Sequence, residues 1–467
     1  MAAPQFRAGV GRATITPPLT VPHAGWGAAT HVYPEGIETD LWSTVLVLED
    51  GQARAAIVDL DLVTITTQEA QAIAAAVGGE LGIAPEQVRV SVTHNHTGPP
   101  GSRSHMTAGA EALQRYYQSV PEFSAGAARI ALGNLRPARI GIGSGQSRVA
   151  VNRREDAPGG RIATGVNFKG TIDPEVFVLR IDGTDGAPLA AIVGYTMHPT
   201  TAGPTFRRIT ADWPGHLKRT VQRLTGATCV FAQGATGNVG PGPEGYTSDA
   251  EVIRRLGRLV GYEAARVHLS LHVPRVEFAH ERIWESGAPL GKWISRPVAS
   301  PEPIVRTRTV QLALPLREQP APAEAEARSA QAQRALQELV ARGAPAKEIE
   351  AATFVSKRAN MSVGRARAYH GRTETAVTLH LLRVGPAVLA GIPAEPFAEI
   401  ALAIKAKSPF PHTWFGGYTG GWAGYIPIPE EYPRGGYEVD TTPFAPEAAA
   451  RVVDGTLAAL REFHAAP

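Results

Sequence analysis

The stretch STVLVLEDGQARAAIVDLDLV, residues 43–63, decides the fold of this chain, because two apolar, β-rich runs flank a Gly-containing turn. This pattern predicts two antiparallel strands joined by a short turn. The same plan returns in EVFVLRIDGTDGAPLAAIVGYTMH, residues 175–198, and in VTLHLLRVGPAVLAGIPAE, residues 377–395. The sequence therefore predicts three hairpins, and each runs into polar residues: Asp59 and Asp61, His198, and Glu395.

Two interpretations of these hairpins stay open. Hairpins of this kind are common, so the simpler interpretation is that they are unrelated strands of a sheet. In the second interpretation, strands of a shared sheet deliver their terminal polar side chains to one rim of the molecule.

Helical segments alternate with the strands. The predicted helices and their start signals are residues 65–82 with Thr66 or Thr67, residues 248–269 with Ser248, and the amphipathic residues 445–466 with Pro446. We therefore expect an α/β (α+β) protein, in which a mixed β-sheet core has flanking helices and carries a metal site at its strand ends.

The chain of 467 residues could form about three folding units or one large domain with insertions. The chain contains no tandem repeat and no low-complexity tail, and we expect a single domain over residues 1–467. Between residues 315 and 369 the composition shifts to Ala, Glu, Gln and Arg, and Gly343 and Pro345 separate two predicted helices. We interpret this segment as an inserted helical hairpin or lid. Its charges form a solvated face or, alternatively, a homo-oligomer contact.

Composition excludes several classes of protein. Lys and Arg number 46 against 43 Asp and Glu, so the net charge of +3 gives little support to nucleic-acid binding. The single cysteine, Cys229, excludes an internal disulfide framework and fits a reducing compartment. We expect no membrane span and no signal segment, and hence a soluble cytoplasmic protein.

The strongest local signal is QVRVSVTHNHTGPP, residues 87–100. Valines alternate with polar residues from Val88 to Val92, and a continued strand register would place His94 and His96 on one face. The Thr-Gly-Pro-Pro that follows ends the strand, so both imidazoles are expected at a rim. Both could bind one metal, or one could bind while the other transfers protons. A hydrogen-bonded pair of rim histidines is the alternative.

Two further segments offer metal ligands. His198 follows an apolar strand, and Glu395 lies between two prolines before a predicted helix. Catalytic zinc sites use three such ligands and keep an open position, so His94, His198 and Glu395 form a candidate set. Glu395 could instead merely favour the positive end of the helix. We interpret Asp212 as a helix N-cap, with orientation of a metal-bound histidine as the alternative.

Two Gly-rich loops complete the candidate site. The turn in TCVFAQGATGNVGPGPEG, residues 228–245, could hold an oxyanion with its backbone N–H groups and with Asn238. Residues 414–438 set several aromatic side chains among glycines, which suits an apolar ligand pocket, although a packed surface loop explains the pattern equally well. The residues assigned to the substrate pocket are Tyr418, Trp422 and Trp26.

Together these segments resemble the N-terminal catalytic domain of the neutral/alkaline, non-lysosomal ceramidase family. The motifs AGVGRATITPP, THNHTGPP, VNRRED, MHPTTAG, ITADWPG, IPAEP and YIPIPEEY stand in the family's order and span most of the chain. The resemblance implies a zinc-dependent amide hydrolase that holds one Zn²⁺ per chain and acts on a small acylated substrate.

The resemblance also implies roles for individual residues. The family's metal ligands match His94, His198, Glu395 and, as an unusual metal-bound tyrosine, Tyr425. Two further matches line the family's active site. His96 is the expected proton shuttle, and Arg153 is expected to hold a carbonyl or carboxylate of the substrate.

Departures from the family pattern change the expected substrate. Sphingolipid-cleaving members carry a Ser where this chain has Gly240, so we expect no hydroxyl nucleophile there, and we expect Gly240 at a positive φ. The family's C-terminal β-sandwich domain is also expected to be missing. We therefore expect metal-activated water to hydrolyse an amide of a soluble substrate rather than ceramide. An esterase or lactonase and a non-catalytic metal- or lipid-binding relative are the alternatives.

Overall fold

The computed structural model describes residues 5–23, 25–29, 31–101, 108–298 and 303–465. Within these residues, the larger of the two main sheets has eight strands. Its strands are β1 (Arg7–Thr14), β3 (Trp42–Glu49), β4 (Arg54–Leu60), β5 (Val88–Val92), β6 (Arg136–Gln146), β9 (Glu175–Gly183), β10 (Pro188–Tyr195) and β12 (Thr228–Gln233). They are ordered β12-β10-β9-β6-β1-β3-β4-β5. Parallel and antiparallel pairs both occur, which confirms the predicted mixed sheet.

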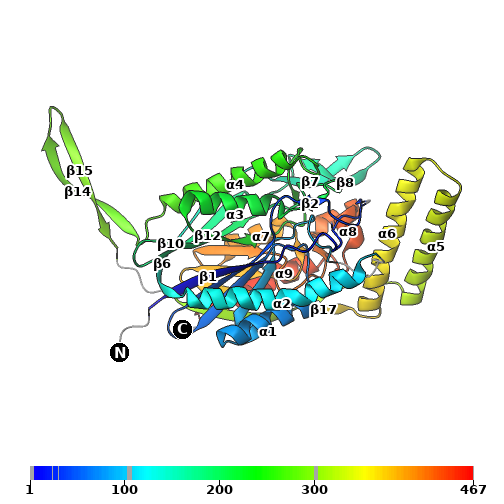
Figure 1. The fold of residues 1–467 in the computed structure, drawn as a ribbon, viewed down its shortest axis with the longest axis horizontal. Helices are drawn as coiled ribbons and strands as arrows, with labels where there is room; N and C mark the ends of the chain where they lie inside the picture. Colours follow the sequence, from blue (N-terminus) through cyan, green and yellow to red (C-terminus); the bar gives the residue numbers. More distant parts are fainter. Residues whose placement is uncertain (1–4, 24, 30, 102–107, 299–302, 466–467) are drawn as a thin grey trace.

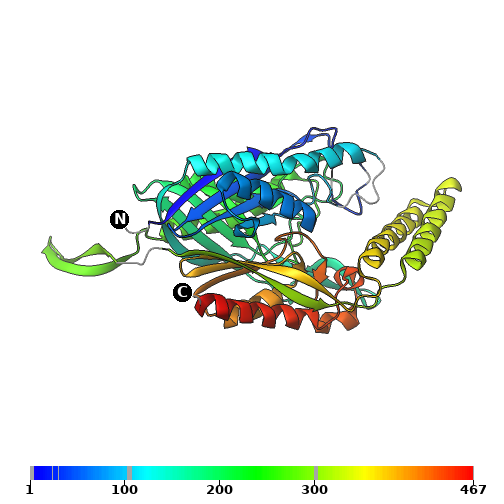
Figure 2. The ribbon, with the colours of Figure 1, turned by 90° about the horizontal axis from the view of Figure 1, so that it is seen from below.

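Helices cover the outer face of this sheet (Figure 2). One pair, α1 (Thr67–Leu81) and α2 (Ala110–Gly133), shares an apolar core with β3, β4 and β5. The other pair, α3 (Asp212–Thr225) and α4 (Ala250–Ser270), shares a core with β9, β10 and β12. These helices bury the outer face of the strands with which they share a core.

A second sheet packs against the inner face. It contains β16 (Val305–Pro315), β17 (Glu374–Val384), β18 (Ala387–Gly391) and β20 (His412–Gly416), in that order. One apolar cluster joins the two sheets, and another joins the smaller sheet to α7 (Ala398–Lys407) and α9 (Ala448–Ala465). The molecule is thus built as helix, sheet, sheet and helix layers, and the sequence did not reveal the second sheet (Figure 2).

The three predicted hairpins are confirmed as the antiparallel pairs β3–β4, β9–β10 and β17–β18. The second strand of each hairpin pairs in parallel with the strand that follows the next helix: β4 with β5, β10 with β12, and β18 with β20. Parallel strands end at the same edge of a sheet, so the loops after each pair meet there. Two hairpins belong to the larger sheet and one to the smaller, so the interpretation that all three share one sheet is wrong.

One of the three predicted helix starts is correct, and the other two differ from the structure by a few residues. Thr66 caps α1 with a capping box to Glu69. The cap of α4 is Asp249 rather than Ser248, because its carboxylate accepts from the Glu251 N–H. The final helix begins at Ala448, so Pro446 precedes its first turn.

The inserted helical hairpin is confirmed as α5 (Pro322–Ala341) and α6 (Ala346–Tyr369), which project from one end of the molecule (Figure 1). Gly343 adopts a φ of 65° between them, and Pro345 is the N-cap of α6. At the opposite end, β14 (Val276–Glu285) and β15 (Pro289–Pro297) form a second projection, which sequence analysis did not foresee.

Short elements connect these layers. They are β2 (Gly36–Ile37), β7 (Val151–Ala157), β8 (Arg161–Asn167), β11 (Arg208–Ile209), β13 (Val239–Gly240), β19 (Glu395–Pro396), β21 (Tyr425–Ile426), α8 (Tyr437–Thr441) and the 3-10 turns Pro85–Gln87 and Pro429–Arg434. None of the helices in the described residues is both long and apolar enough to cross a membrane.

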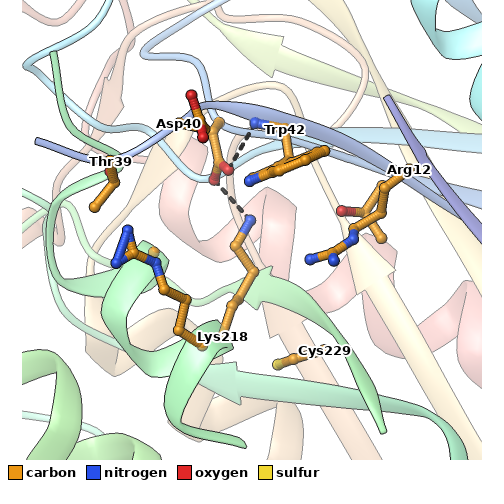
Figure 3. A pocket seen from close by; sticks show the side chains of 10 residues that line it. Arg12, Thr39, Asp40, Trp42, Lys218 and Cys229 are labelled. Carbon is orange, nitrogen blue, oxygen red and sulfur yellow. Dashed lines mark hydrogen bonds and ion pairs between the residues drawn. The ribbon is translucent and has the colours of Figure 1, made fainter. Parts of the chain in front are cut away.

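The first hairpin ends in a buried ion cluster rather than in a site rim. Lys218 of α3 places its Nζ 2.6 Å from Asp61 Oδ1 and 3.2 Å from Asp59 Oδ2. A cavity of about 30 Å³ adjoins this cluster and is also lined by Cys229 (Figure 3). The Asp61 carboxylate accepts from the Trp42 N–H as well, at 3.0 Å. The two aspartates therefore fasten α3 to β3 and β4.

Candidate metal centre

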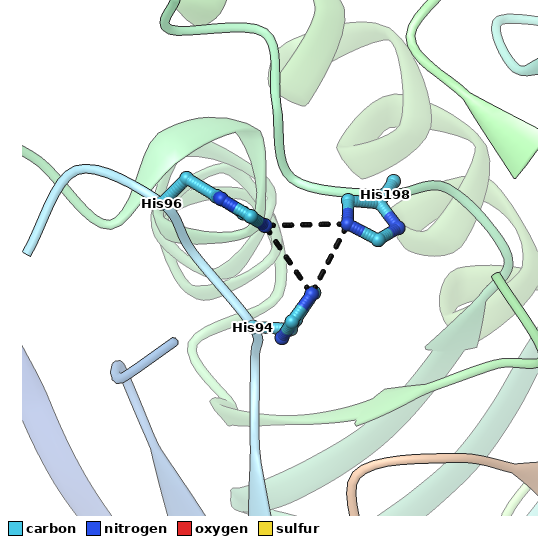
Figure 4. A group of neighbouring side chains, drawn as sticks. All are labelled: His94, His96 and His198. Atoms are coloured by element: carbon cyan, nitrogen blue, oxygen red, sulfur yellow. Dashed lines mark hydrogen bonds between the residues drawn. The ribbon is translucent and has the colours of Figure 1, made fainter. Parts of the chain in front are cut away.

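Three histidine side chains converge where the ends of the parallel strand pairs meet (Figure 4). The Nε2 atom of His94 lies 3.1 Å from that of His198 and 3.2 Å from that of His96, and the remaining pair is also 3.2 Å apart. Ligand atoms of a tetrahedral zinc site lie about 3.3–3.4 Å apart when each bond is about 2.0–2.1 Å. The triangle is therefore close to the size that a zinc ion requires.

The two histidines of the His-x-His motif meet for a different reason than the sequence indicated. Strand β5 ends at Val92, so the register of the valines does not continue to the histidines. His94 instead adopts a φ of 68°, in the left-handed region that non-glycine residues rarely occupy. This turn brings its ring edge-on to the ring of His96, with ring centroids 4.8 Å apart.

Each ring is oriented by a backbone carbonyl that faces its Nδ1 atom. The carbonyl of Val63 lies 2.6 Å from Nδ1 of His94, that of Gly25 lies 3.2 Å from Nδ1 of His96, and that of Thr236 lies 3.3 Å from Nδ1 of His198. A carbonyl can only accept, so each Nδ1 carries the proton and each Nε2 lone pair points inward.

Burial keeps these rings neutral. It lowers the pKa of His94 to about 3, and burial together with the neighbouring His94 lowers the pKa of His96 to about 3 as well. The pKa of His198 is also lowered by burial. Neutral imidazoles are the form that binds metal, so the donor set fits a zinc ion.

Glu395 lies beside the triangle, with its Oε2 atom 3.6 Å from Nε2 of His94. The Tyr418 hydroxyl donates to Oε2 at 3.0 Å, and the indole N–H of Trp422 donates to Oε1 at 2.7 Å. Burial raises the pKa of Glu395, while the Trp422 hydrogen bond opposes this rise. The carboxylate is thus held beside the triangle, whereas the ligand atoms that lie close enough together to hold one ion are those of the three histidines.

Tyr425 and Arg153 extend this group. Tyr425 pairs with Glu395 through β21 and β19, and its hydroxyl accepts from Nη2 of Arg153 at 3.1 Å. Nε of Arg153 donates to Oε1 of Glu438 at 2.9 Å. Glu438 in α8 is a site residue that sequence analysis missed; the pair Arg153-Arg154 was the available signal, because adjacent buried arginines require a carboxylate partner.

Two predicted site residues have other contacts. Asn238 donates from Nδ2 to Glu399 at 2.8 Å and accepts from the Ala398 N–H at 2.9 Å, so its amide fastens the start of α7 and is not directed at the histidines. Asp212 is the first residue of α3 rather than its N-cap, and its carboxylate accepts from the N–H groups of Trp213 and Ala202. It supports the loop after His198 without touching the imidazole.

The three predicted pocket aromatics lie at different depths. Tyr418 is fully buried and stacks on His94, with centroids 4.1 Å apart, so it supports the histidine triangle. Trp26 packs against His96 with centroids 5.0 Å apart. Trp422 is 43% exposed although its indole N–H reaches Glu395, so it extends from the metal ligands to the surface.

Gly240 does not occupy a strained turn. It lies in β13, where it pairs with Val151 of β7, and its φ is not positive. A Cβ atom at this position would lie 3.3 Å from Cβ of Arg153. The expected positive φ is therefore wrong, because the backbone here is a short antiparallel strand that most residues could adopt.

Comparisons with known proteins agree with this architecture. The sequence model of the neutral/alkaline non-lysosomal ceramidase family, N-terminal domain, matches residues 6–246. The neutral ceramidase of Pseudomonas aeruginosa is 25% identical over 247 residues, which are 50% of this chain and 37% of that protein. The chain thus aligns with well under two thirds of this relative's length.

Two solved structures share the fold. The crystal structure of neutral ceramidase from Pseudomonas aeruginosa matches with a TM-score of 0.68 at 20% identity, over 98% of this chain and 75% of that chain. A ceramidase complexed with C2 matches with a TM-score of 0.66 at 20% identity, over 98% and 76% of the two chains.

Proposed function

Because this chain belongs to the neutral/alkaline non-lysosomal ceramidase family, we propose that it is a zinc-dependent hydrolase of an amide (N-acyl) bond. The observation that carries the proposal is the triangle of Nε2 atoms, each oriented by a carbonyl behind it and flanked by the Glu395 carboxylate. Three histidines, or two histidines and one glutamate, are typical ligands of zinc sites that perform hydrolysis, and this group offers either set.

The residues that would hold the zinc ion are His94, His198 and Glu395, with Tyr425 assigned from the family resemblance. Zinc bound there would activate a water molecule and polarise the substrate carbonyl. Two roles are possible for His96, because its Nε2 atom is as close to the Nε2 atoms of His94 and His198 as those two atoms are to each other. It either completes the ligand set or moves a proton at the edge of the site.

The remaining side chains of the site would bind and orient the substrate. Arg153 is held by Glu438 and Tyr425 and would present its guanidinium to a carbonyl or carboxylate oxygen of the substrate. Trp422 and Trp26 would border the path from the surface to the metal ligands. Asn238 is not included as an oxyanion donor, because its amide is already hydrogen-bonded to Glu399 and Ala398.

The proposed substrate is a soluble N-acylated small molecule rather than ceramide. This follows from Gly240, which leaves the chain without the hydroxyl that sphingolipid-cleaving relatives carry at that position. An esterase or lactonase at the same zinc site is the second candidate, because a polarised carbonyl is attacked similarly in all three classes of substrate.

An activity screen tests the proposal directly. The zinc-loaded protein would be assayed against N-acyl amino acids, N-acyl amines, short esters and lactones, with the chelator-treated protein as control. We expect amide hydrolysis that disappears on chelation and returns with zinc. Activity confined to esters or lactones would support the second candidate, and no zinc-dependent hydrolysis of any class would contradict both.

A further inference from the structure

Tyr246 is a strained residue close to the metal centre that none of the roles above uses. Its φ of 57° lies in the left-handed region, which is unfavourable for a bulky side chain. The backbone around it is tightly constrained: its N–H donates to the Thr200 carbonyl at 3.1 Å, and Thr247 pairs with Ala202. The loop that begins at His198 therefore fixes where this tyrosine stands.

The Tyr246 hydroxyl is buried and donates no hydrogen bond within the described part of the chain, although the Thr200 side chain lies close enough to interact with the phenol oxygen. Leaving a buried hydroxyl unpaired costs about 1–3 kcal/mol. A phenylalanine would avoid that cost with the same ring. A tyrosine at this position therefore calls for a partner that is not part of the protein.

The residues around the Tyr246 hydroxyl connect it to the histidine triangle and to Arg153. The Tyr246 ring packs edge-on to Trp26, with centroids 5.7 Å apart, and Trp26 in turn packs on His96. On the other side, a Cβ atom at Gly240 would lie 3.8 Å from the hydroxyl oxygen and 3.7 Å from Cδ of Arg153. The same Cβ atom would lie 3.3 Å from Cβ of Arg153, so the gap that Gly240 leaves between the phenol and Arg153 is narrow and has room for a single atom.

Arg153 brings a second donor to this space. Its Nε and Nη2 atoms are engaged by Glu438 and Tyr425, whereas Nη1 has no hydrogen-bond partner among the described residues. Burial raises the pKa of the Tyr246 phenol, so it stays protonated and acts as a donor at neutral pH. The two residues that flank Gly240, Tyr246 and Arg153, thus each keep a donor without a partner, and together they suit an oxygen atom that accepts from both.

We propose that the Tyr246 hydroxyl donates a hydrogen bond to an oxygen of the substrate, in the space between Gly240 and Arg153. The ligand group is a carbonyl or carboxylate oxygen of the N-acylated substrate. Tyr246 thereby supplies the side-chain donor that Asn238 cannot supply. This inference rests on the proposed amide hydrolase activity, and it also predicts ligand binding that can be measured without turnover.

The test compares Tyr246→Phe with the wild-type protein. We expect kcat/KM for the best amide to fall about 10- to 100-fold, the range for losing one hydrogen bond to a developing negative charge. Zinc content should stay at the wild-type value and the thermal unfolding midpoint should not fall, because the ring keeps its packing on Trp26 and the variant removes an unpaired buried hydroxyl. Tyr262→Phe, in the exposed part of α4, is the matched control and should leave kcat/KM unchanged.

A double mutant separates a substrate contact from a structural role. In the Tyr246→Phe background, Gly240→Ser introduces a hydroxyl next to the place that the phenol oxygen left. We expect this second change to restore part of the lost kcat/KM, whereas a structural defect would not respond to it. Unchanged kcat/KM in Tyr246→Phe, or no restoration in the double mutant, would overturn the inference.

Calorimetry distinguishes failure of this inference from failure of the proposed function. Acetohydroxamate, a zinc-binding probe with a carbonyl oxygen, should bind the zinc-loaded wild-type protein about 10-fold more tightly than the Tyr246→Phe variant. Equal affinities would overturn the inference whether or not amides are hydrolysed. A difference in affinity without hydrolysis of any amide would uphold the inference and contradict the proposed function.

Discussion

At the scale of single residues, the metal centre depends on backbone carbonyls as much as on the histidines. Without the acceptors at Val63, Gly25 and Thr236, each imidazole could present either nitrogen to the centre. The carbonyls select one tautomer for each ring, so the three Nε2 atoms are available together. These acceptors come from loops after β4 and β12 and from the N-terminal segment, which explains why no local motif reveals them.

Removing a metal ligand should empty the site. We expect His94→Ala, His198→Ala and Glu395→Gln each to lower the zinc content of the purified protein from about one per chain to near zero, because three or four donors act together on one ion. Elemental analysis measures this. His280→Ala, in the exposed hairpin β14–β15, is the control and should retain zinc. Near-stoichiometric zinc in all three variants would refute the ligand set.

The role of His96 can be decided by one substitution. If His96 transfers a proton, His96→Ala should keep zinc and lose about 10²-fold or more in kcat, the usual contribution of a positioned acid or base. Zinc content and kcat are measured on the same preparation. Loss of zinc from this variant would instead make His96 the third nitrogen ligand and leave the proton shuttle unassigned.

A buried histidine outside the centre should give the protein an acid-sensitive stability. Burial, followed by the charge of His31, lowers the pKa of His23 to about 4 from its usual 6.5. Between these values the unfolded chain binds a proton that the folded chain does not, so stability falls as pH falls from about 6.5 to about 4. His23 alone should therefore account for about 2 kcal/mol of the stability lost between pH 7 and pH 5.

Urea unfolding at pH 7 and pH 5 measures this loss. The loss of free energy of unfolding between pH 7 and pH 5 should be about 2 kcal/mol smaller in His23→Gln than in the wild-type protein. In His280→Gln this loss should equal that of the wild-type protein. If the loss of stability between pH 7 and pH 5 is the same in His23→Gln as in the wild-type protein, then the folded protein holds His23 as the charged imidazolium, in contact with the Thr97 and Arg208 carbonyls.

At the scale of elements, each of the three hairpins works with the helix and strand that follow it. The parallel pairs β4–β5, β10–β12 and β18–β20 end at one side of the molecule, and the loops that leave them carry His94, His198 and Glu395. The short pairs β7–β13 and β19–β21 then fix Arg153 and Tyr425 in register with these loops. The site is thus assembled from strand ends, which are more rigid than long loops.

Gly240 in the short strand β13 affects the expected number of steps in the hydrolysis, because it provides no hydroxyl group. Gly240 offers no hydroxyl, so we expect hydrolysis by single displacement without an acyl-enzyme intermediate. Rapid-mixing kinetics with a chromogenic amide or ester should show no burst, and mass spectrometry of quenched reactions should show an unmodified chain. An acyl adduct on any residue would refute this and direct attention to Thr200, Thr201 and Thr236.

At the scale of the whole molecule, the packing of the two sheets holds the halves of the site together. The histidines come from the larger sheet and Glu395 from the smaller one, so their distance depends on the shared core. Gly194 in β10 lies at this interface, and a Cβ atom there would lie 2.6 Å from the indole of Trp414 in β20. The absence of a side chain allows the two sheets to approach.

Filling this contact should weaken the whole domain. We expect Gly194→Ala to lower the free energy of unfolding by about 1–3 kcal/mol, the usual cost of overpacking a core. Denaturant unfolding followed by tryptophan fluorescence checks the value. Gly79→Ala, on the exposed face of α1 with no neighbour near its Cβ, should instead be neutral or slightly stabilising. Equal effects at both positions would refute the interface argument.

The sequence by itself determined the elements of this protein. Apolar periodicity and turn residues located the three hairpins, the helices α1, α4 and α9, and the helical insertion, because these patterns depend on neighbours close in the chain. They did not locate α2 or the hairpin β14–β15. The same local signals marked His94, His96, His198 and Glu395 at element ends. The resemblance to a known family added Tyr425 and Arg153, which no spacing rule identified.

Only the tertiary structure decided how these elements combine. Contacts between distant residues separate the hairpins into two packed sheets, move Asp59 and Asp61 into an ion cluster with Lys218, and occupy the amide of Asn238 at α7. They also turn His94 into the left-handed region and place Tyr246 beside Gly240. Hydrogen bonds and packing between segments far apart in the chain fix these positions, and a pattern of neighbouring residues carries no record of them.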